Sequence, residues 1–390
     1  MGEWKKVKLG DCIKEVVEKT TENNQYEVLT SSKNGIFSQE EYFDKQVASK
    51  NNVGYKIIKK GQFTYRSMSD SGSFTINRLE NKDIGIVSPA YPVFEVKEIN
   101  PDYLKYFFDS EMFRKAIHNL SQGSTRTALK YKDLIEIEML LPTIEEQIKI
   151  VKILEKVDLI IKKYEKLLKE KNQFIKSKFI EMFERTNEGE KTKVEDICRE
   201  MKIGPFGSAL HKKEIRENGE VFVLGTDNAV DNEFKIYEKR YIDNDKYQQL
   251  IKYTAHDGDI IISMMGTIGK TAIIPDGFGK AIISSHLCYL TPDSTKITSR
   301  FLNNMFKYSS SIKYQISKQQ RGAVMNGLNL KIIKNLEFNL PSMDMQKKFE
   351  IIVKLIDKQK LELKKIIENY QKLKKGLMQQ LLTGKIKVKI

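Results

Sequence analysis

The segment GTIGKT at residues 266–271 is the part of the chain that most resembles a catalytic or cofactor-binding motif. A glycine-rich turn followed by Lys270 and Thr271 is typical of loops that hold nucleotide phosphates. The full phosphate-loop pattern also requires a glycine five positions before Gly269, and that position is Met264. The segment lies between two strand-like segments, so no helix N-terminus follows it to bind a phosphate. We therefore expect no nucleotide binding here.

A second motif, NPDY at residues 100–103, is similar to the NPPY of amino-methyltransferases, which holds the target amine. The second proline is missing, and no glycine-rich cofactor loop precedes the motif. We interpret Asn100 as a helix cap and Pro101 as the first helical residue. No paired carboxylates, Ser–His–Asp set or Cys–His pair occurs in both halves of the chain. We expect neither catalysis nor a cofactor in this chain.

The chain is strongly basic, with 67 Lys and Arg residues against 52 Asp and Glu, a net charge of +15. Such an excess favours a polyanionic partner, nucleic acid before membrane, although a lysine-rich protein from an AT-rich genome would look similar. Cys12, Cys198 and Cys288 are too far apart in the sequence for a metal-binding motif, which favours a reducing, cytoplasmic location and no metal. No signal peptide and no membrane-spanning run is evident.

Polar and basic residues in glycine-containing loops are the candidates for contact with double-stranded DNA. Such side chains read base edges, and Lys, Arg and backbone amides bind phosphates. In the first half the candidates are Arg66, Ser67, Ser69, Ser73, Tyr91, Arg126 and Lys130. In the second half they are Ser208, His211, Lys212, Lys213, Thr267, Lys270, Thr271, Ser285, His286, Arg321 and Asn326. For His286, a histidine buried in the core is an equally good interpretation.

These loops recur because the chain is an internal duplication. The passage 322–346 matches 123–147 at an offset of 199 positions, and the segment beginning at Gly258 matches that beginning at Gly61 at 197. Each copy has a strand-rich region punctuated by Gly, Asp and Ser, followed by a short helix. A glycine-containing loop, a strand ending in LLP or NLP, and a long helix complete the copy.

Apolar residues in each long helix recur at steps of three and four, which is typical of a coiled-coil seam. The seam residues are Ile150, Ile153, Val157, Ile160, Tyr164, Leu167 and Phe174 in the first helix, and Phe349, Ile352, Ile356, Leu363, Ile366, Tyr370, Leu373 and Leu377 in the second. Ile175, Phe179 and Met182 indicate that the first seam rotates near its end. Helices of about 40 residues are about 60 Å long. We expect them to pair antiparallel under a pseudo-twofold axis; packing on their own domains or on another chain is the alternative.

Four stretches resemble the specificity subunit of type I restriction-modification systems. They are PFGSAL at 205–210, GDIIISMMGTIGKTAIIP at 258–275, LPTIEEQIKIVKIL at 141–154 and LKKGLMQQLLTGKIKV at 373–388. The resemblance covers nearly the whole chain, although the second long helix begins with LPSMDMQ instead of the family's LP…EEQ pattern.

The resemblance implies an α+β protein with two α/β target-recognition domains, each followed by a long conserved helix. The expected boundaries are 1–142 and 187–341 for the recognition domains, and 143–186 and 342–390 for the helices with the tail. It also implies a non-catalytic subunit that holds two adenine methyltransferase subunits and, in the full complex, ATP-dependent translocase–nuclease subunits. Each recognition domain would read one half of a split DNA site.

Because the two sets of loops differ in sequence, we expect a bipartite, non-palindromic target with a short unread gap. Half-sites on one face of DNA lie about 34 Å apart, a distance that the long helices can span. The clusters FIKSKFIEMF (174–183) and LMQQLL (377–382) would dock the methyltransferase, or pack on the chain's own recognition domains. The alternative function is a structural coiled-coil adaptor with non-specific DNA affinity.

Overall fold

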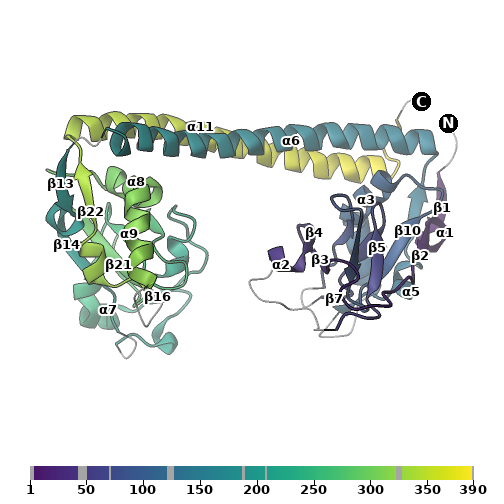
Figure 1. Cartoon of the computed structure of the whole chain (residues 1–390), viewed down its shortest axis with the longest axis horizontal. Helices are drawn as coiled ribbons and strands as arrows, with labels where there is room; N and C mark the ends of the chain where they lie inside the picture. Colours follow the sequence, from purple (N-terminus) through teal and green to yellow (C-terminus); the bar gives the residue numbers. More distant parts are fainter. Residues whose placement is uncertain are drawn as a thin grey trace. The chain divides into compact units, whose positions relative to one another are not determined.

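The computed structural model describes residues 4–42, 51–69, 72–120, 127–186, 189–206, 209–321 and 327–388. The chain divides into two compact units (Figure 1). The first unit combines Met1–Lys166 with Lys364–Ile390, and the second comprises Leu167–Leu363. The long helices α6 (Ile144–Phe179) and α11 (Met343–Leu382) therefore contribute residues to both units.

The first unit contains short helices and short strands in addition to its parts of α6 and α11. The helices are α1 (Leu9–Cys12), α2 (Gln39–Tyr42), α3 (Pro101–Asp109), α4 (Glu111–Leu120) and α5 (Tyr131–Leu134). The strands are β1 (Lys5–Lys8), β2 (Ile13–Glu15), β3 (Leu29–Ser32), β4 (Gly35–Ser38), β5 (Lys56–Lys59), β6 (Phe63–Tyr65), β7 (Met68–Ser69), β8 (Ile76–Arg78), β9 (Ile84–Val87), β10 (Val93–Val96), β11 (Thr127–Ala128) and β12 (Glu138–Leu141).

The second unit is built in a similar way, with several single-turn helices. The helices are the π-helical turn η1 (Ile180–Glu184), the 3-10 turns η2 (Val194–Ile197), η3 (Lys212–Glu214), η4 (Thr226–Asn228) and η5 (Ile251–Tyr253), and α7 (Asn244–Leu250), α8 (Ser299–Tyr308), α9 (Ser310–Arg321) and α10 (Leu330–Lys334). The strands are β13 (Glu190–Lys193), β14 (Cys198–Ile203), β15 (Val221–Leu224), β16 (Tyr241–Ile242), β17 (Thr254–Ala255), β18 (Ile260–Ser263), β19 (Thr271–Ile273), β20 (Ala281–Ile283), β21 (Leu287–Pro292) and β22 (Glu337–Leu340).

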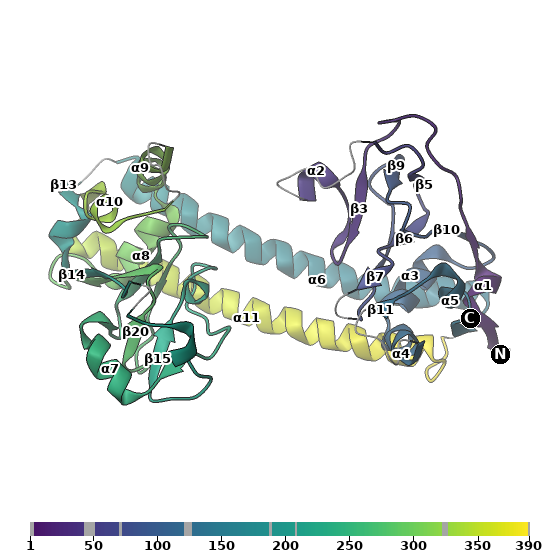
Figure 2. The ribbon, with the colours of Figure 1, turned by 90° about the horizontal axis from the view of Figure 1, so that it is seen from below.

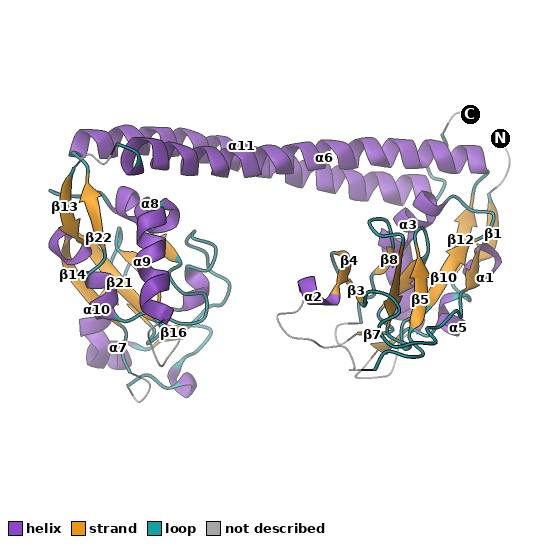
Figure 3. Cartoon of the chain, viewed as in Figure 1, coloured by secondary structure: helices purple, strands orange, loops and turns teal. Residues whose placement is uncertain are grey.

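The two units share one sheet topology. The first has an antiparallel four-stranded sheet in the order β2-β10-β6-β8, and the second has β14-β21-β18-β19 in the corresponding order. The strand before each long helix pairs with an N-terminal strand of its unit, β12 with β1 and β22 with β13. In Figure 3, α3 lies beside the strands of the first unit, and α8 and α9 lie beside those of the second. This topology agrees with the duplication predicted from the sequence.

The short helix after each sheet is capped by a polar side chain. Asn100 Oδ1 accepts hydrogen bonds from the backbone N–H groups of Asp102 and Tyr103, at 2.9 and 3.0 Å, and Pro101 opens α3. Thr298 Oγ1 caps α8 by accepting from Phe301 N at 3.1 Å. The interpretation of NPDY as a helix start is confirmed.

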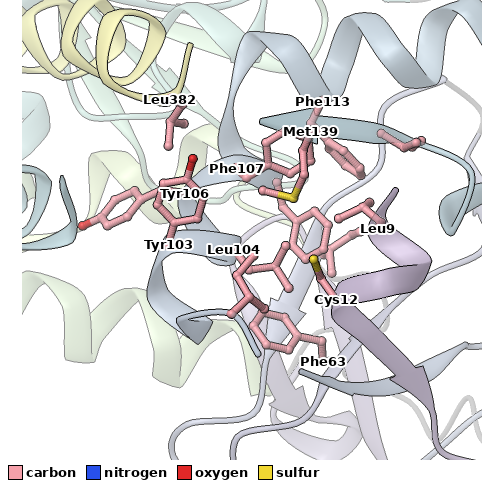
Figure 4. Packing of buried hydrophobic residues seen from close by; sticks show 14 of the residues in the cluster. Leu9, Cys12, Phe63, Tyr103, Leu104, Tyr106, Phe107, Phe113, Met139 and Leu382 are labelled. Carbon is pink, nitrogen blue, oxygen red and sulfur yellow. The ribbon is translucent and has the colours of Figure 1, made fainter. Parts of the chain in front are cut away.

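The core of the first unit draws side chains from both ends of the chain. Figure 4 shows Phe63, Leu104 and Cys12 packed together, and it places Leu382 near Tyr106. Leu382 belongs to α11, so the last helix of the chain completes the core of the first recognition region.

The long helices pack against each other in both units, and the pairing is antiparallel. In the first unit, Lys374 Nζ of α11 lies 2.7 Å from the Asp158 carboxylate of α6, and the Tyr164 and Tyr370 rings stack at 6.0 Å. In the second unit, the Phe179 and Phe349 ring centroids are 5.6 Å apart. Early residues of α6 thus meet late residues of α11, and late residues of α6 meet early residues of α11.

The coiled-coil prediction is correct for most of the seam and wrong at particular positions. Ile150 and Val157 of α6 are buried as predicted. Leu373 is exposed instead, because the buried face of α11 rotates onto Ile367 and Met378. Phe174 is also exposed, while Ile175 and Phe179 are buried, which confirms the predicted rotation of the first seam near its end. Leu167 is also exposed. Late in each helix, the recognition region covers part of the surface that a lone helix pair would share.

The structure decides how the two aromatic- and methionine-containing clusters are used. Phe179 and Phe183 lie in the core of the second unit, while Met378, Leu381 and Leu382 lie in the core of the first. Packing on the chain's own recognition regions is therefore the correct alternative for these residues.

Within the described residues, no helix combines the length and the apolar character needed to cross a membrane. The same residues contain no group of three or more His, Cys, Asp or Glu side chains placed to hold a metal ion.

Replacing Phe349 by alanine should destabilise the second unit by about 3–5 kcal/mol, because it removes a fully buried ring from an aromatic cluster. Phe349 is 0% exposed and also contacts Phe183 at 5.4 Å between ring centroids. Hydrogen exchange of the second unit's amides measures the loss. The matched control is Phe174→Ala, because Phe174 of α6 is 45% exposed. This variant should change stability by less than about 0.5 kcal/mol. Equal losses in both variants would contradict this account of the core.

Candidate nucleic-acid interface

Four backbone segments of the second unit meet around Met264. The Met264 N–H donates to the carbonyl of His286 at 2.9 Å, and the Met264 carbonyl accepts from Leu328 N at 2.9 Å. Gly204 N donates to the carbonyl of Leu287 at 3.1 Å, which brings the beginning of the PFGSAL segment to the same place. The hairpin loop 264–270 therefore lies next to the strand start at 284–287 and the end of the duplicated glycine loop.

The hairpin loop is held in a tight conformation that only its glycines allow. Gly266 and Gly269 have φ values of +71° and +75°, in the left-handed region that side-chain-bearing residues rarely adopt. Ser263 Oγ accepts from Lys270 N at 3.0 Å and donates to the carbonyl of Thr267, while Gly269 N donates to Ser263 O at 2.8 Å. The fold of the loop leaves the Thr267 side chain exposed and that of Lys270 half-buried.

The first unit builds the corresponding arrangement with the same backbone hydrogen bond. Leu129 N donates to the Ser67 carbonyl at 2.9 Å, as Leu328 N does to Met264. Next to this bond, β7 pairs antiparallel with β11, which sets Ser69 opposite Thr127. In both copies, therefore, the end of the glycine loop is attached to the segment after the central strand β6 or β18.

A hollow of about 840 Å³ lies beside this junction in the first unit. Its walls include four residues that the sequence analysis singled out, Arg66, Ser69, Ser73 and Tyr91. The remaining described residues of the wall are Thr30, Ser31, Ser32, Lys33, Asn34, Gln39, Tyr42, Met68, Phe74 and Thr75. A hollow rich in hydroxyl, amide and cationic groups is suited to hydrogen bonding with base edges and phosphates.

The β3–β4 hairpin is the part of this site that the sequence analysis missed. Asn77 Nδ2 donates to Ser31 Oγ and to the Ser32 carbonyl, both at 2.8 Å, and so fixes the hairpin against β8. Lys33 and Asn34 at its tip are exposed. The dipeptide Asn34-Gly35 is a strong hairpin signal that could have located this element, and Gly35 has a φ of +123°.

Positive charge gathers beside the hairpin loop in the second unit. Burial lowers the pKa of Lys313 on α9, and the nearby charges of Lys176 and Lys270 lower it further, while Glu184 opposes the shift. Glu184 is itself engaged, since its Oε1 accepts from Ser309 Oγ at 2.8 Å. A phosphate near these lysines would relieve their mutual repulsion.

The predicted contact residues differ from one another in their exposure to solvent. The exposed ones are Arg66, Ser73, Lys130, His211, Lys212, Lys213, Thr267 and His286, and the half-buried ones are Ser67, Ser69, Tyr91, Lys270 and Ser285. Arg126, Ser208 and Asn326 lie outside the described residues, as does the side chain of Arg321. Because His286 is exposed, the alternative of a buried core histidine is wrong.

Thr271 does not belong to this surface. Its side chain is 0% exposed on β19, and its Oγ1 has no hydrogen-bond partner among the described residues. Its backbone N–H donates to Asn232 Oδ1 at 3.3 Å. Its place in a glycine-containing loop suggested an exposed hydroxyl, but Thr271 already belongs to β19, where Ala272 beside it is buried as well. We therefore remove Thr271 from the candidate contacts.

His211, Lys212 and Lys213 lie at another part of the second unit. The preceding Leu210 packs against Val221 and Ile282, in the sheet formed by β16, β15, β20 and β17. Figure 2 shows α7 and β15 of this unit on one side and α9 and α10 on the other. Glu214, just after these residues, pairs with Lys246 of α7 at 2.9 Å, so this basic run lies on the α7 side.

Comparison with known proteins returns one family for both copies. A model of the type I restriction modification DNA specificity domain matches residues 1–173 and again residues 187–374. The two matches cover most of the chain and follow the duplication found in the sequence.

Similar proteins carry the same description. The chain is 28% identical over 325 residues to the type I restriction enzyme MjaVIII specificity subunit of Methanocaldococcus jannaschii, covering 78% of this chain and 75% of that protein. It is 27% identical over 307 residues to the putative MjaX specificity subunit of the same organism, covering 75% and 69%. A chain solved in work on complex assembly and conformational transition of the type I R-M system has the same fold, with a TM-score of 0.61, 14% identity and 98% of each chain covered.

Lys270 and Thr271 are neighbours in the chain, but their substitution should affect DNA binding differently. Lys270→Ala should weaken binding to duplex DNA and lower the slope of log affinity against log salt concentration by about one, as the loss of one phosphate contact does. Thr271→Val should leave both affinity and stability unchanged, because it replaces a buried hydroxyl that has no partner by a methyl group. Titrations of labelled duplex at several salt concentrations measure both variants. A larger effect from Thr271→Val than from Lys270→Ala would refute this picture of the loop.

Proposed function

The chain belongs to the type I restriction-modification DNA specificity family, whose members are non-catalytic specificity subunits, and we propose that its two units each read one half of a bipartite DNA site. The recognition domains are residues 1–142 and 187–341. The helical segments 143–186 and 342–390 set the spacing between the half-sites.

The observation that carries this proposal is a conserved backbone scaffold with different side chains. In both copies a leucine N–H attaches the glycine loop to the segment after the central strand, through Leu129 and Leu328. The side chains around this hydrogen bond differ: Arg66 and Tyr91 in one unit, and Lys270 and His286 in the other. Since base readout depends on donor and acceptor patterns, two such surfaces read different sequences. The target is therefore non-palindromic.

The antiparallel helix pair supports a spacer role. A helix of 36 residues such as α6 is about 54 Å long, which exceeds the separation of about 34 Å between half-sites one DNA turn apart. The gap between the half-sites is not read, because its length is set by the helices and not by base contacts.

The partners proposed for the chain are two adenine methyltransferase subunits and, in a restriction complex, translocase–nuclease subunits. The paired helices leave apolar side chains for such partners. Ile351 and Leu355 of α11, one helical turn apart, are 67% and 57% exposed. Large exposed aliphatic side chains on a helix are suited to docking another protein.

Co-expression with a methyltransferase subunit and genome-wide mapping of methylated adenine tests the reading function. We expect one split motif. Exchanging residues 1–142 for those of a relative should change one half of the motif and leave the other intact. Scattered methylation without a motif would favour the alternative, a structural coiled-coil adaptor with non-specific DNA affinity.

Substitutions on α11 test whether Ile351 and Leu355 form the docking surface for the methyltransferase. The double variant Ile351→Asp and Leu355→Asp should reduce co-purification of the methyltransferase by at least about tenfold, because it places charge in an apolar contact. The isolated chain should still bind DNA. The double variant Lys354→Ser and Lys358→Ser alters the charge of the same helix equally at exposed positions, and it should retain the partner. Loss of the partner in both variants would point to charge and not to the apolar contact.

A further inference from the structure

A buried glutamine joins the first recognition region to its long helix. Gln147 lies in the first turns of α6 and is only 1% exposed. Its Nε2 donates to the Pro142 carbonyl at 2.9 Å, just before the helix, and its Oε1 accepts from Asn100 N at 2.8 Å. Asn100 is the residue that caps α3, so one amide ties the beginning of α6 to the beginning of α3.

The second unit repeats this connection with a different cap residue. Gln346, 0% exposed in α11, donates from Nε2 to the carbonyls of Pro341 at 2.9 Å and Lys296 at 3.0 Å. Its Oε1 accepts from Thr298 N at 3.1 Å, and Thr298 caps α8. The cap changes from asparagine to threonine, but the glutamine contacts the backbone of the cap, so its role does not depend on the cap's side chain.

Other features at the start of the long helices are not shared by the two copies. In the first, Glu146 accepts from Thr143 N at 3.1 Å and forms a capping box with it. In the second, Met345 takes the place of this glutamate and has no side-chain oxygen to return a bond, while Ser342 Oγ accepts from Met345 N at 3.4 Å. The departure of LPSMDMQ from LP…EEQ therefore removes the capping box and keeps the glutamine. What both copies retain is the bridge from the long helix to the short helix.

We propose that Gln147 and Gln346 are positioning residues that fix the orientation of each recognition region on its long helix. A primary amide is suited to this task, since it donates and accepts at once and bonds to backbone groups that every residue except proline provides. Because the amide is buried, its loss leaves a backbone N–H and a carbonyl without partners, so the junction must loosen or admit water. The consequence for half-site selectivity rests on the proposed function, whereas the orientation itself does not.

Distances within the first unit test the orientation directly. Nitroxide labels are placed at exposed Lys130, at the end of the glycine loop, and at exposed Lys156 on α6, through non-canonical amino acids that leave the three cysteines in place. In the full chain carrying Gln147→Met, which keeps side-chain length without the amide, we expect the distance distribution to broaden. The matched substitution Gln371→Met, at an exposed glutamine of the same unit, should leave it unchanged. A Gln147→Met distribution that matches the wild type would overturn the proposal.

Half-site selectivity provides the second arm, measured in the complex with the methyltransferase. Gln147→Met should lower discrimination against base changes about tenfold in the half-site read by the first unit, and change the other less than twofold. Gln346→Met should lower discrimination in the half-site read by the second unit and leave the other nearly unchanged. Its control is Gln173→Met, at an exposed glutamine. If Gln147→Met does not fold, Gln346→Met tests the proposal in its place. Equal loss in both half-sites would indicate general destabilisation and refute a positioning role.

A second variant tests the donor side of the amide. Gln147→Glu keeps an acceptor for Asn100 N, but it sets a buried carboxylate oxygen against the Pro142 carbonyl, so its distribution should broaden at least as much as that of Gln147→Met. A Gln147→Glu variant with the wild-type distribution and selectivity would refute the bond to Pro142 as a positioning contact. If the wild-type complex methylates no split site, the proposed function fails, while the label distances still decide the positioning claim.

Discussion

The apolar stripe of each long helix has to be buried, and the rest of the structure depends on how this is done. Each unit contains part of both α6 and α11, so each core is completed by a helix from the other copy of the repeat. Leu381 and Leu382, near the end of the chain, lie in the same core as Leu9. Neither copy of the duplication therefore closes its core without a helix from the other copy.

The features that the two copies share differ in kind from those in which they differ. Strand order, the leucine N–H bond at Leu129 or Leu328, and the buried glutamines recur in both units because they hold backbone to backbone. The side chains that point away from this frame are free to differ. A protein that reads two unlike DNA half-sites needs this division, since changing a loop side chain alters readout without disturbing the helices.

Some of the chain's basic residues gather at the candidate DNA-binding surfaces, while others form ion pairs. Burial, together with the nearby charges of Lys176 and Lys270, lowers the pKa of Lys313 in the second unit, and Arg66 lines the hollow of the first. Many other lysines form ion pairs, such as Lys374 with Asp158 at the helix pair. Net charge therefore favoured a polyanionic partner, while the arrangement of particular lysines among glycine loops marks the surface to which we propose that this partner binds.

The sequence by itself determined the duplication, the antiparallel helix pair and the Asn100 cap, because these depend on spacing and periodicity that the residue order displays. The α+β class and the family followed from the resemblance of particular stretches to known specificity subunits. It did not determine which way a side chain faces where two layers compete for it. Thr271 is buried, Leu373 is exposed and the Ser31–Asn34 hairpin joins the hollow because of contacts between residues far apart in the chain. Only the tertiary structure decides such cases, since burial is a property of the packed neighbours and not of the residue alone.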